Sequence, residues 1–383
     1  MSNIYIDITG LSYKHQSGVQ NTLWGLVNGA ESLNYLEKNK IFFYDCSGKL
    51  NSSINSRFHD NYINELYSTK KNVSILIKKL YDYGLLKLKF NPSEKSINHV
   101  WNWGIKELKG ARNSITMYDI LPLQFPEFFS KKMINLTETS IDFALNKCSQ
   151  IQCISNYTKS LLVNNFAFRE ENIKVVYPSI SHLYFEENSS TEESNIFLNQ
   201  FSLNKAEYFI SIGYLDPRKN LVNQIKAFKL YAERSGNKIK YALTGFPGSY
   251  TNEILTLIND SSLKGKVVFL GFLEMGTLKI AIENSAGLLY CSKAEGFGIP
   301  IIEGYACKTN VVTSNTTSMV EIGEGRAYLA DPDNIEDIAE GISRAYSNKN
   351  STLILNNYEY SKNFTDDNWL KGHFFRDEYE LPK

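Results

Sequence analysis

Short apolar segments with strand character alternate with segments of helical period along most of this chain. Parallel strands need a long crossover connection, which a helix supplies, so the alternation predicts βαβ units and mainly parallel sheets. Strands are expected at residues 4–8, 40–44, 115–117, 150–154, 208–212, 239–243, 267–270, 287–290 and 310–313. Helices are expected between them, for example over 21–33, 140–147, 158–164, 220–234, 252–258, 278–284, 299–307 and 335–346.

One polar stretch interrupts this alternation. Residues 186–195 (EENSSTEESN) consist of Glu, Ser, Asn and Thr, so they are expected to form a loop or linker. A chain of 383 residues exceeds one ordinary core, and the alternation restarts after the polar stretch. We therefore predict an α/β protein with two Rossmann-like domains, at 1–185 and 201–363, joined by a linker at 186–200. Residues 364–383 are expected to form a helix that crosses back to the first domain.

The charge balance limits the classes of partner. The 41 basic and 41 acidic residues cancel, which argues against a general nucleic-acid binder. Residues 1–165 nevertheless carry 19 Lys and Arg against 13 Asp and Glu, and the remainder carries 22 against 28. Either this asymmetry is chance, or the first domain meets something anionic such as a lipid surface or a phosphorylated acceptor.

We expect neither a signal peptide nor a membrane-spanning helix in the sequence as given. No uncharged apolar stretch approaches the roughly 18 residues of a membrane-spanning helix, and MSNIYIDITG does not read as a signal peptide. The five Cys residues lack metal-ligand spacing. We expect a cytoplasmic chain, with peripheral contact at the inner face of the plasma membrane as a further possibility.

Residues 292–304 (SKAEGFGIPIIEG) are the most informative segment. A predicted strand ends, a Gly-rich loop follows, and Pro300 falls in the first helical turn, where proline is favoured. The free N–H groups at such a helix start form an anion site. They belong to Phe297, Gly298 and Ile299.

Two carboxylates flank this helix start, Glu295 in the loop and Glu303 within the first turns. A carboxylate does not bind phosphate, but it accepts hydrogen bonds from sugar hydroxyls. The segment therefore predicts a ligand that has both phosphate and sugar parts. The simpler alternative for Glu303 is that it only complements the helix dipole.

The spacing of Glu295 and Glu303, with seven residues between them, resembles the E-x7-E signature of the retaining GT-B glycosyltransferases of the GT4 family (glycosyl transferases group 1). The segments 306–315, 318–321 and 329–333 follow in the family's order, and residues 213–220 (GYLDPRKN) resemble its basic phosphate-binding loop. The resemblance is strong over about 205–345 and looser in the first domain. It implies two Rossmann-like domains that face each other across a cleft.

The resemblance also implies roles for individual residues. Arg218 and Lys219 would compensate the charge of a departing nucleoside diphosphate; the alternative is a solvated pair that caps a surface loop. Glu303 would hold the donor ribose, and Glu295 would contact the hydroxyls of the transferred sugar. Family members of this fold generally need no metal, so neither a metal nor another cofactor is expected.

The first domain carries weaker signals. His15 and Gly18 lie in a segment, HQSGVQ, that is similar to the family's N-terminal Gly loop, which approaches the donor phosphates and the acceptor. An ordinary βα turn is the alternative. Residues 115–122 (ITMYDILP) resemble the family's T-x-H-D-x-x-P segment, with Tyr118 where many relatives carry His. Asp119 keeps the family position and is a candidate catalytic contact, and His15 and Tyr118 are candidates on the acceptor side.

Residues 68–91 carry six Lys and one Asp among apolar residues. Such a stretch either lies on an anionic membrane or forms a helix with a solvated Lys face. Contact with a membrane would suit a lipid-linked acceptor.

The resemblance implies transfer of a hexose, such as mannose or rhamnose, from a nucleoside-diphosphate sugar to a hydroxyl of a glycan or lipid-linked acceptor. Retention of anomeric configuration and a place in cell-surface polysaccharide or O-antigen assembly would follow by analogy. Two alternatives remain open: a catalytically silent partner of another glycosyltransferase, which the departure at Tyr118 favours, and a GT-B nucleotide-sugar epimerase.

Overall fold

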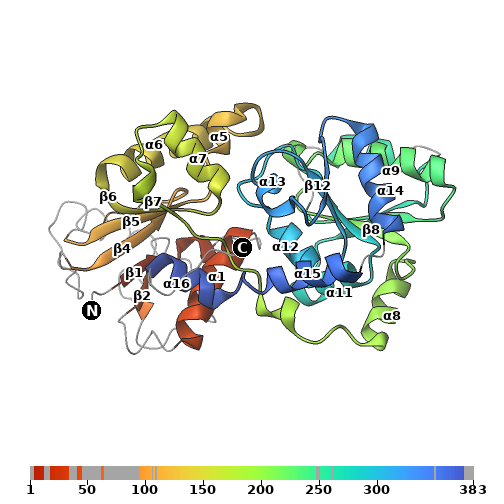
Figure 1. Cartoon of the computed structure of the whole chain (residues 1–383), viewed down its shortest axis with the longest axis horizontal. Helices are drawn as coiled ribbons and strands as arrows, with labels where there is room; N and C mark the ends of the chain where they lie inside the picture. The colour runs from red at the N-terminus through yellow and green to blue at the C-terminus, as the bar shows by residue number, and fades with distance from the viewer. Residues whose placement is uncertain are drawn as a thin grey trace, which may run out of the picture. The chain divides into compact units, whose positions relative to one another are not determined.

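Figure 1 shows the computed structural model of the chain. It describes residues 4–12, 18–33, 41–44, 62–63, 95–105, 107, 110–246, 251–259, 262–348 and 351–374. The chain divides into two compact units. Unit 1 combines Met1–Ser179 with Thr365–Leu381, and unit 2 is Ile180–Phe364. The first boundary thus lies after residue 179 rather than after residue 185.

Within the described part of unit 1, seven strands form a parallel sheet in the order β3-β2-β1-β4-β5-β6-β7. The strands are β1 (Ile4–Asp7), β2 (Ile41–Tyr44), β3 (Tyr62–Ile63), β4 (Ile97–Trp101), β5 (Arg112–Met117), β6 (Cys148–Cys153) and β7 (Ile173–Val175). The order reverses between β1 and β4, and loops at such a switch point commonly form a binding site.

Helices cover the sheet of unit 1. Apolar side chains of α6 (Lys131–Lys147) and α7 (Asn156–Asn165) pack on β4, β5 and β6 in one buried cluster. The opposite face carries α1 (Gly18–Ser32) and α16 (Asp366–Phe374). Helix α1 begins three residues before the expected start at residue 21.

Helix α16 belongs to unit 1 although residues 180–364, which form the bulk of unit 2, precede it in the sequence. The Trp369 indole donates to the carbonyl oxygen of Thr22 on α1 at 2.8 Å, and His373 reaches Thr116 on β5 at 2.8 Å. In Figure 1 the blue α16 lies against the red α1. The predicted return of this helix to the first domain is confirmed.

The described part of unit 2 contains a six-stranded parallel sheet in the order β10-β9-β8-β11-β12-β13. Its strands are β8 (Tyr208–Ile212), β9 (Lys240–Thr244), β10 (Val267–Gly271), β11 (Gly287–Tyr290), β12 (Val311–Ser314) and β13 (Tyr328–Ala330). Its helices are α8 (Thr191–Gln200), α9 (Leu221–Ser235), α10 (Thr251–Ile258), α11 (Met275–Glu283), α12 (Ile299–Ala306), α13 (Ser318–Gly323), α14 (Ile335–Ser347) and α15 (Ser351–Ser361).

The expectation of a loop or linker over 186–200 was wrong, because α8 forms there. Ser190 and Glu193 build a capping box: the Ser190 side chain accepts from the Glu193 amide, and the Glu193 carboxylate accepts from the Ser190 amide at 2.8 Å. The apolar residues of the helix follow the polar run, and Phe197 and Leu198 are buried. The polar stretch therefore contains the first turn of a helix.

No helix among these described residues has the length and apolar character needed to cross a membrane. The basic segment 68–91 lies outside the described residues.

Candidate functional site

The loop after β8 places two cations at the carboxyl end of the unit 2 sheet. Asp216 caps a short 3-10 turn, Pro217–Lys219, by accepting from the Arg218 amide at 2.9 Å. Asn220 then adopts a left-handed conformation (φ 58°), and its side-chain amide donates to the carbonyl oxygens of Cys291 and Pro332 at 2.9 and 2.7 Å. These bonds tie the loop that carries Arg218 and Lys219 to the segments that follow β11 and β13.

The loop between β11 and α12 carries Glu295. Ser318 at the start of α13 donates to the carbonyl oxygens of Glu295 and Phe297 at 2.8 and 3.0 Å, and the Glu295 amide donates to Thr317 at 3.2 Å. Gly298 (φ +111°) ends the loop, and Ile299 begins α12 with Pro300 in the first turn, as predicted. This bracing gives the loop a fixed backbone.

These two loops bring Arg218, Lys219 and Glu295 together. One Glu295 carboxylate oxygen lies 2.6 Å from Arg218 Nη1, and the other lies 2.7 Å from Lys219 Nζ. Glu295 is only 7% exposed. Burial alone would raise the pKa of its carboxyl, but the charges of Arg218 and Lys219 outweigh burial and hold that pKa at about 2. Glu295 is therefore ionised, and the three side chains form one charged cluster.

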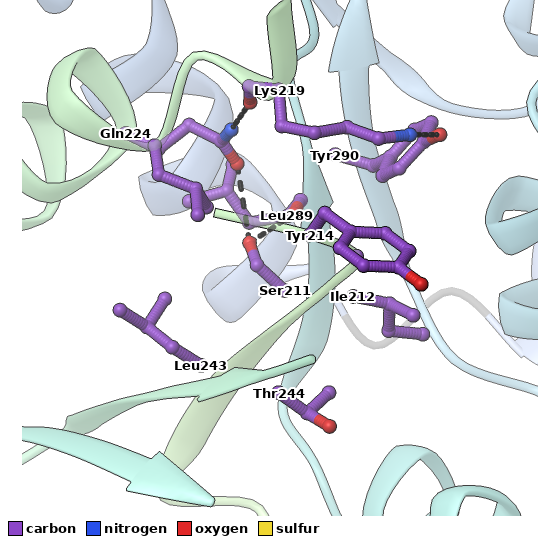
Figure 2. A pocket seen from close by; sticks show the side chains of 11 residues that line it. Ser211, Ile212, Tyr214, Lys219, Gln224, Leu243, Thr244, Leu289 and Tyr290 are labelled. Atoms are coloured by element: carbon purple, nitrogen blue, oxygen red, sulfur yellow. Dashed lines mark hydrogen bonds between the residues drawn. The ribbon is translucent and has the colours of Figure 1, made fainter. Parts of the chain in front are cut away.

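Tyr290, the last residue of β11, also holds Lys219. The ammonium donates to the Tyr290 hydroxyl at 2.7 Å and lies 4.8 Å from the centre of the ring. Burial lowers the pKa of Lys219, and the neighbouring Glu295 only partly offsets this. Figure 2 shows the Lys219–Tyr290 contact at a small pocket, with Tyr214 on another side and Gln224 bonded to the Lys219 carbonyl oxygen.

Glu303 lies on α12 and is 6% exposed. Burial raises the pKa of its carboxyl, and the nearby Tyr184 hydroxyl offsets only part of this rise, so the pKa is about 7. Phe297 is buried against Phe364, with ring centres 5.8 Å apart. The predicted donor-binding residues all lie in the loop before α12 or on α12 itself: Phe297, Gly298, Ile299 and Glu303.

Three aromatic rings stack at the same end of the sheet. A Gly–aromatic dipeptide follows or closes each of the adjacent strands β8, β9 and β10: Gly213–Tyr214, Gly245–Phe246 and Gly271–Phe272. Tyr214 and Phe246 have ring centres 5.6 Å apart, and Phe246 and Phe272 have centres 4.6 Å apart.

These ring distances are close to the spacing of about 4.8 Å between neighbouring strands, so the sheet itself sets the stack. The three glycines all have positive φ, which other residues rarely adopt. Tyr214 is 38% exposed and Phe272 is 40% exposed, so ring surface is accessible at both ends of the stack. The sequence signal that points to this stack is the recurrence of a Gly–aromatic dipeptide after neighbouring strands.

The candidates in unit 1 form a separate group. Gly18 is the first residue of α1, and His15 lies outside the described residues. Tyr118 is 9% exposed, and its hydroxyl hydrogen-bonds to that of Thr22. One Asp119 carboxylate oxygen accepts from the Leu121 amide at 3.1 Å, at the start of the short helix α5 (Leu121–Gln124).

Tyr118 also packs in an aromatic cluster at the carboxyl end of β4 and β5. Trp101 and Trp103 stack with centres 5.2 Å apart, and Trp103 meets Tyr118 edge to face at 4.5 Å. Burial raises the pKa of Tyr118 far above its ordinary value, so the phenol stays protonated. Among the described residues, no group of three or more His, Cys, Asp or Glu side chains gathers as a metal site.

Part of the chain matches a known protein family. Residues 194–362 match the family "Glycosyl transferases group 1". The chain is similar to O-antigen chain mannosyltransferase B of Escherichia coli, with 26% identity over 59% of this chain and 59% of that protein. It is also similar to O-antigen chain mannosyltransferase RfbU of Salmonella typhimurium, with 27% identity over 60% of this chain and 63% of that protein. The chain thus aligns with less than two thirds of either relative.

Solved structures match over nearly the whole chain. HepE of Anabaena, crystallised with UDP and glucose, has a TM-score of 0.70 and 16% identity, over 97% of this chain and 98% of its own. WaaG, a glycosyltransferase involved in lipopolysaccharide biosynthesis, has a TM-score of 0.67 and 11% identity, over 97% and 99%. At this identity the likeness establishes the fold. The chain therefore has the fold of these proteins, the GT-B fold, and its residues 194–362 match the glycosyl transferases group 1 family.

Proposed function

We propose that the chain is a retaining glycosyltransferase that moves a hexose from a nucleoside-diphosphate sugar to a hydroxyl of a glycan or lipid-linked acceptor. The observation that carries this proposal is the cluster of Arg218, Lys219 and Glu295 beside the start of α12. Two cations against one carboxylate leave a net positive charge at the carboxyl ends of β8 and β11, which suits a diphosphate.

The same end of the sheet offers groups for the other parts of the donor. The ring stack of Tyr214, Phe246 and Phe272 suits the planar base, since aromatic rings stack on bases of any sequence. The buried carboxyl of Glu303 suits the ribose hydroxyls.

In the transfer step, the bond between the anomeric carbon and the diphosphate oxygen breaks, and the acceptor oxygen bonds to that carbon. The proton of the acceptor hydroxyl passes to the departing diphosphate. Arg218 and Lys219 would stabilise the negative charge that develops on this leaving group. The two O-antigen mannosyltransferases named above make mannose the first hexose to test, with cell-surface polysaccharide as the acceptor class.

The test is the release of nucleoside diphosphate from a panel of GDP-, UDP- and dTDP-sugars in the presence of an acceptor extract. We expect turnover with one donor, reduced about 100-fold or more by Arg218→Ala or Lys219→Ala. Arg234→Ala is the matched control, because Arg234 pairs with Glu336 in the same unit and both side chains are more than half exposed. Undiminished turnover in Lys219→Ala would refute the assigned role.

The alternative from the sequence, a catalytically silent partner, has one structural observation in its favour. The hydroxyl of Tyr118, which stands where the family resemblance implies His, is bonded to Thr22 inside unit 1. A protein that neither turns over any donor nor binds any nucleoside diphosphate would support this alternative.

A further inference from the structure

In the described structure, both cations proposed to meet the diphosphate are already paired with Glu295. The carboxylate spans them, with one oxygen 2.6 Å from Arg218 Nη1 and the other 2.7 Å from Lys219 Nζ. These are short, charge-assisted contacts between largely buried groups, which makes them stronger than surface ion pairs. An incoming diphosphate would compete with Glu295 for the same donors.

Each cation has a second, neutral partner that would remain if Glu295 moved away. Arg218 Nη1 donates to the Ala294 carbonyl oxygen at 2.7 Å, and Lys219 Nζ donates to the Tyr290 hydroxyl at 2.7 Å. The Arg218 and Lys219 side chains therefore keep their direction when the carboxylate leaves.

Glu295, in contrast, is held through its backbone. Its amide donates to Thr317, and its carbonyl oxygen accepts from Ser318 at 2.8 Å, so the main chain is fixed independently of the carboxylate. Rotation about the side-chain torsions is enough to move the carboxylate off the cations while the loop stays in place.

We propose that Glu295 is an internal counter-anion, which occupies Arg218 and Lys219 until the diphosphate displaces it and which returns as the diphosphate leaves. This inference rests on the proposed function, because it takes the diphosphate of the donor as the displacing anion. The released carboxylate becomes available for the hydroxyls of the transferred sugar. The returning carboxylate competes with the product diphosphate and so favours its release.

A physical reason for such a counter-anion lies in the burial of Lys219. Burial lowers the pKa of this ammonium group, and a carboxylate in contact keeps it charged while no ligand is present. As a result, a diphosphate that binds Arg218 and Lys219 must first break the two charge-assisted contacts that they make with Glu295. Removing the charge of Glu295 must therefore tighten the binding of diphosphates even as it impairs transfer.

The experiment is calorimetric titration of the full chain with inorganic pyrophosphate, UDP and GDP. Pyrophosphate carries neither base nor sugar, so it reports only on the exchange of anions at Arg218 and Lys219. We expect Glu295→Gln to bind pyrophosphate, and whichever nucleoside diphosphate is recognised, about tenfold more tightly than the natural chain, a coupling of ordinary size. Glu336→Gln removes the same charge from the Arg234 pair of the same unit and should leave these affinities unchanged.

Equal or weaker binding of pyrophosphate by Glu295→Gln would overturn the inference, as would failure of pyrophosphate to bind any variant. If Glu295→Gln binds pyrophosphate more tightly but no nucleoside diphosphate binds, the exchange stands and the proposed function fails. If turnover is found but Glu295→Gln gains no affinity, the function stands and the inference fails. Glu295→Asp is the second variant should Glu295→Gln melt early: its shorter side chain weakens the double contact, so affinity should again rise.

Discussion

Lys219 and Tyr290 are in contact through both parts of the tyrosine: the ammonium donates to the hydroxyl at 2.7 Å and lies 4.8 Å from the ring centre. The hydroxyl comes from the last residue of β11, so a rigid strand positions a flexible side chain. We expect Tyr290 to be a positioning residue, which acts through Lys219.

Tyr290→Phe keeps the ring and removes the hydroxyl. The loss of one hydrogen bond to a charged group costs about 1.5–3 kcal/mol, so turnover should fall tenfold or more. Without this acceptor the pKa of Lys219 should fall further, and the loss of activity at alkaline pH should begin at a lower pH. The pH dependence of turnover tests this, with Tyr231→Phe as the control, because the Tyr231 hydroxyl accepts from Asn237 instead. An unshifted pH profile would rule out the positioning role.

Phe272→Ala should weaken the binding of nucleoside diphosphates. Removal of the outer ring of the stack costs about 1–3 kcal/mol of base stacking, which is roughly a factor of 5 to 150 in affinity. Binding of inorganic pyrophosphate should not change, since it has no base. Phe269 on β10 is equally exposed, at 40%, but lies within the strand, so Phe269→Ala is the control. Equal effects of the two substitutions would refute a base-stacking role.

Glu303→Gln should stabilise the fold at alkaline pH. The folded pKa of about 7 lies above the ordinary 4.5, so between these values the folded chain binds the proton more tightly than the unfolded chain. The free energy of unfolding therefore decreases as pH rises from about 4.5 to 7, and it reaches its full loss above pH 7. We expect a gain of up to about 3 kcal/mol at pH 8, which disappears near pH 4.

Thermal unfolding at pH 4 and pH 8 measures this difference. Glu336→Gln, which removes an exposed carboxylate paired with Arg234, should show no gain at pH 8. A gain for Glu303→Gln that is the same at both pH values would contradict a raised pKa.

Gly29→Ala should loosen the docking of α16. A Cβ atom on Gly29 of α1 would lie 2.5 Å from the carbonyl oxygen and 3.0 Å from the carbonyl carbon of Asp366, both of them backbone. The helix must shift to make room, at a cost of about 1–3 kcal/mol in the unfolding of unit 1.

Gly276 in α11 is the matched control, because a Cβ atom there meets nothing within 4 Å. Gly276→Ala should be neutral or stabilise unit 2 by about 0.5–1 kcal/mol, as the higher helix propensity of Ala dictates. Calorimetric scans of both variants make the comparison, and equal melting of Gly29→Ala and the natural chain would contradict close docking.

The second half of the fold was readable from sequence because its strands are almost wholly apolar and its glycines punctuate them. β8 and β11 begin and end where the pattern predicted, and Pro300 falls in the first turn of α12. β4 was missed because its Asn98 and His99 look unsuited to a buried strand. Both are buried, Asn98 with Tyr44 and Asn113, and His99 with Ser114 and Thr116.

The residues of the site could be identified from the sequence, but the contacts between them could not. Arg218, Lys219 and Glu295 stood out by type and spacing, yet their contact depends on Thr317 and Ser318, more than twenty residues farther along the chain. The inward turn of the Tyr118 hydroxyl depends in the same way on Thr22, which α1 supplies. Such long-range hydrogen bonds leave no local pattern in the sequence.

The return of α16 to unit 1 has a consequence for synthesis. A ribosome must complete residues 180–364 before α16 emerges, so unit 1 waits with the α16 face of α1 uncovered while unit 2 is made. The indole partner of Thr22 and the histidine partner of Thr116 arrive only then. The contacts that α16 makes in unit 1 therefore cannot form until residues 366–374 have been made, although most of that unit is translated first.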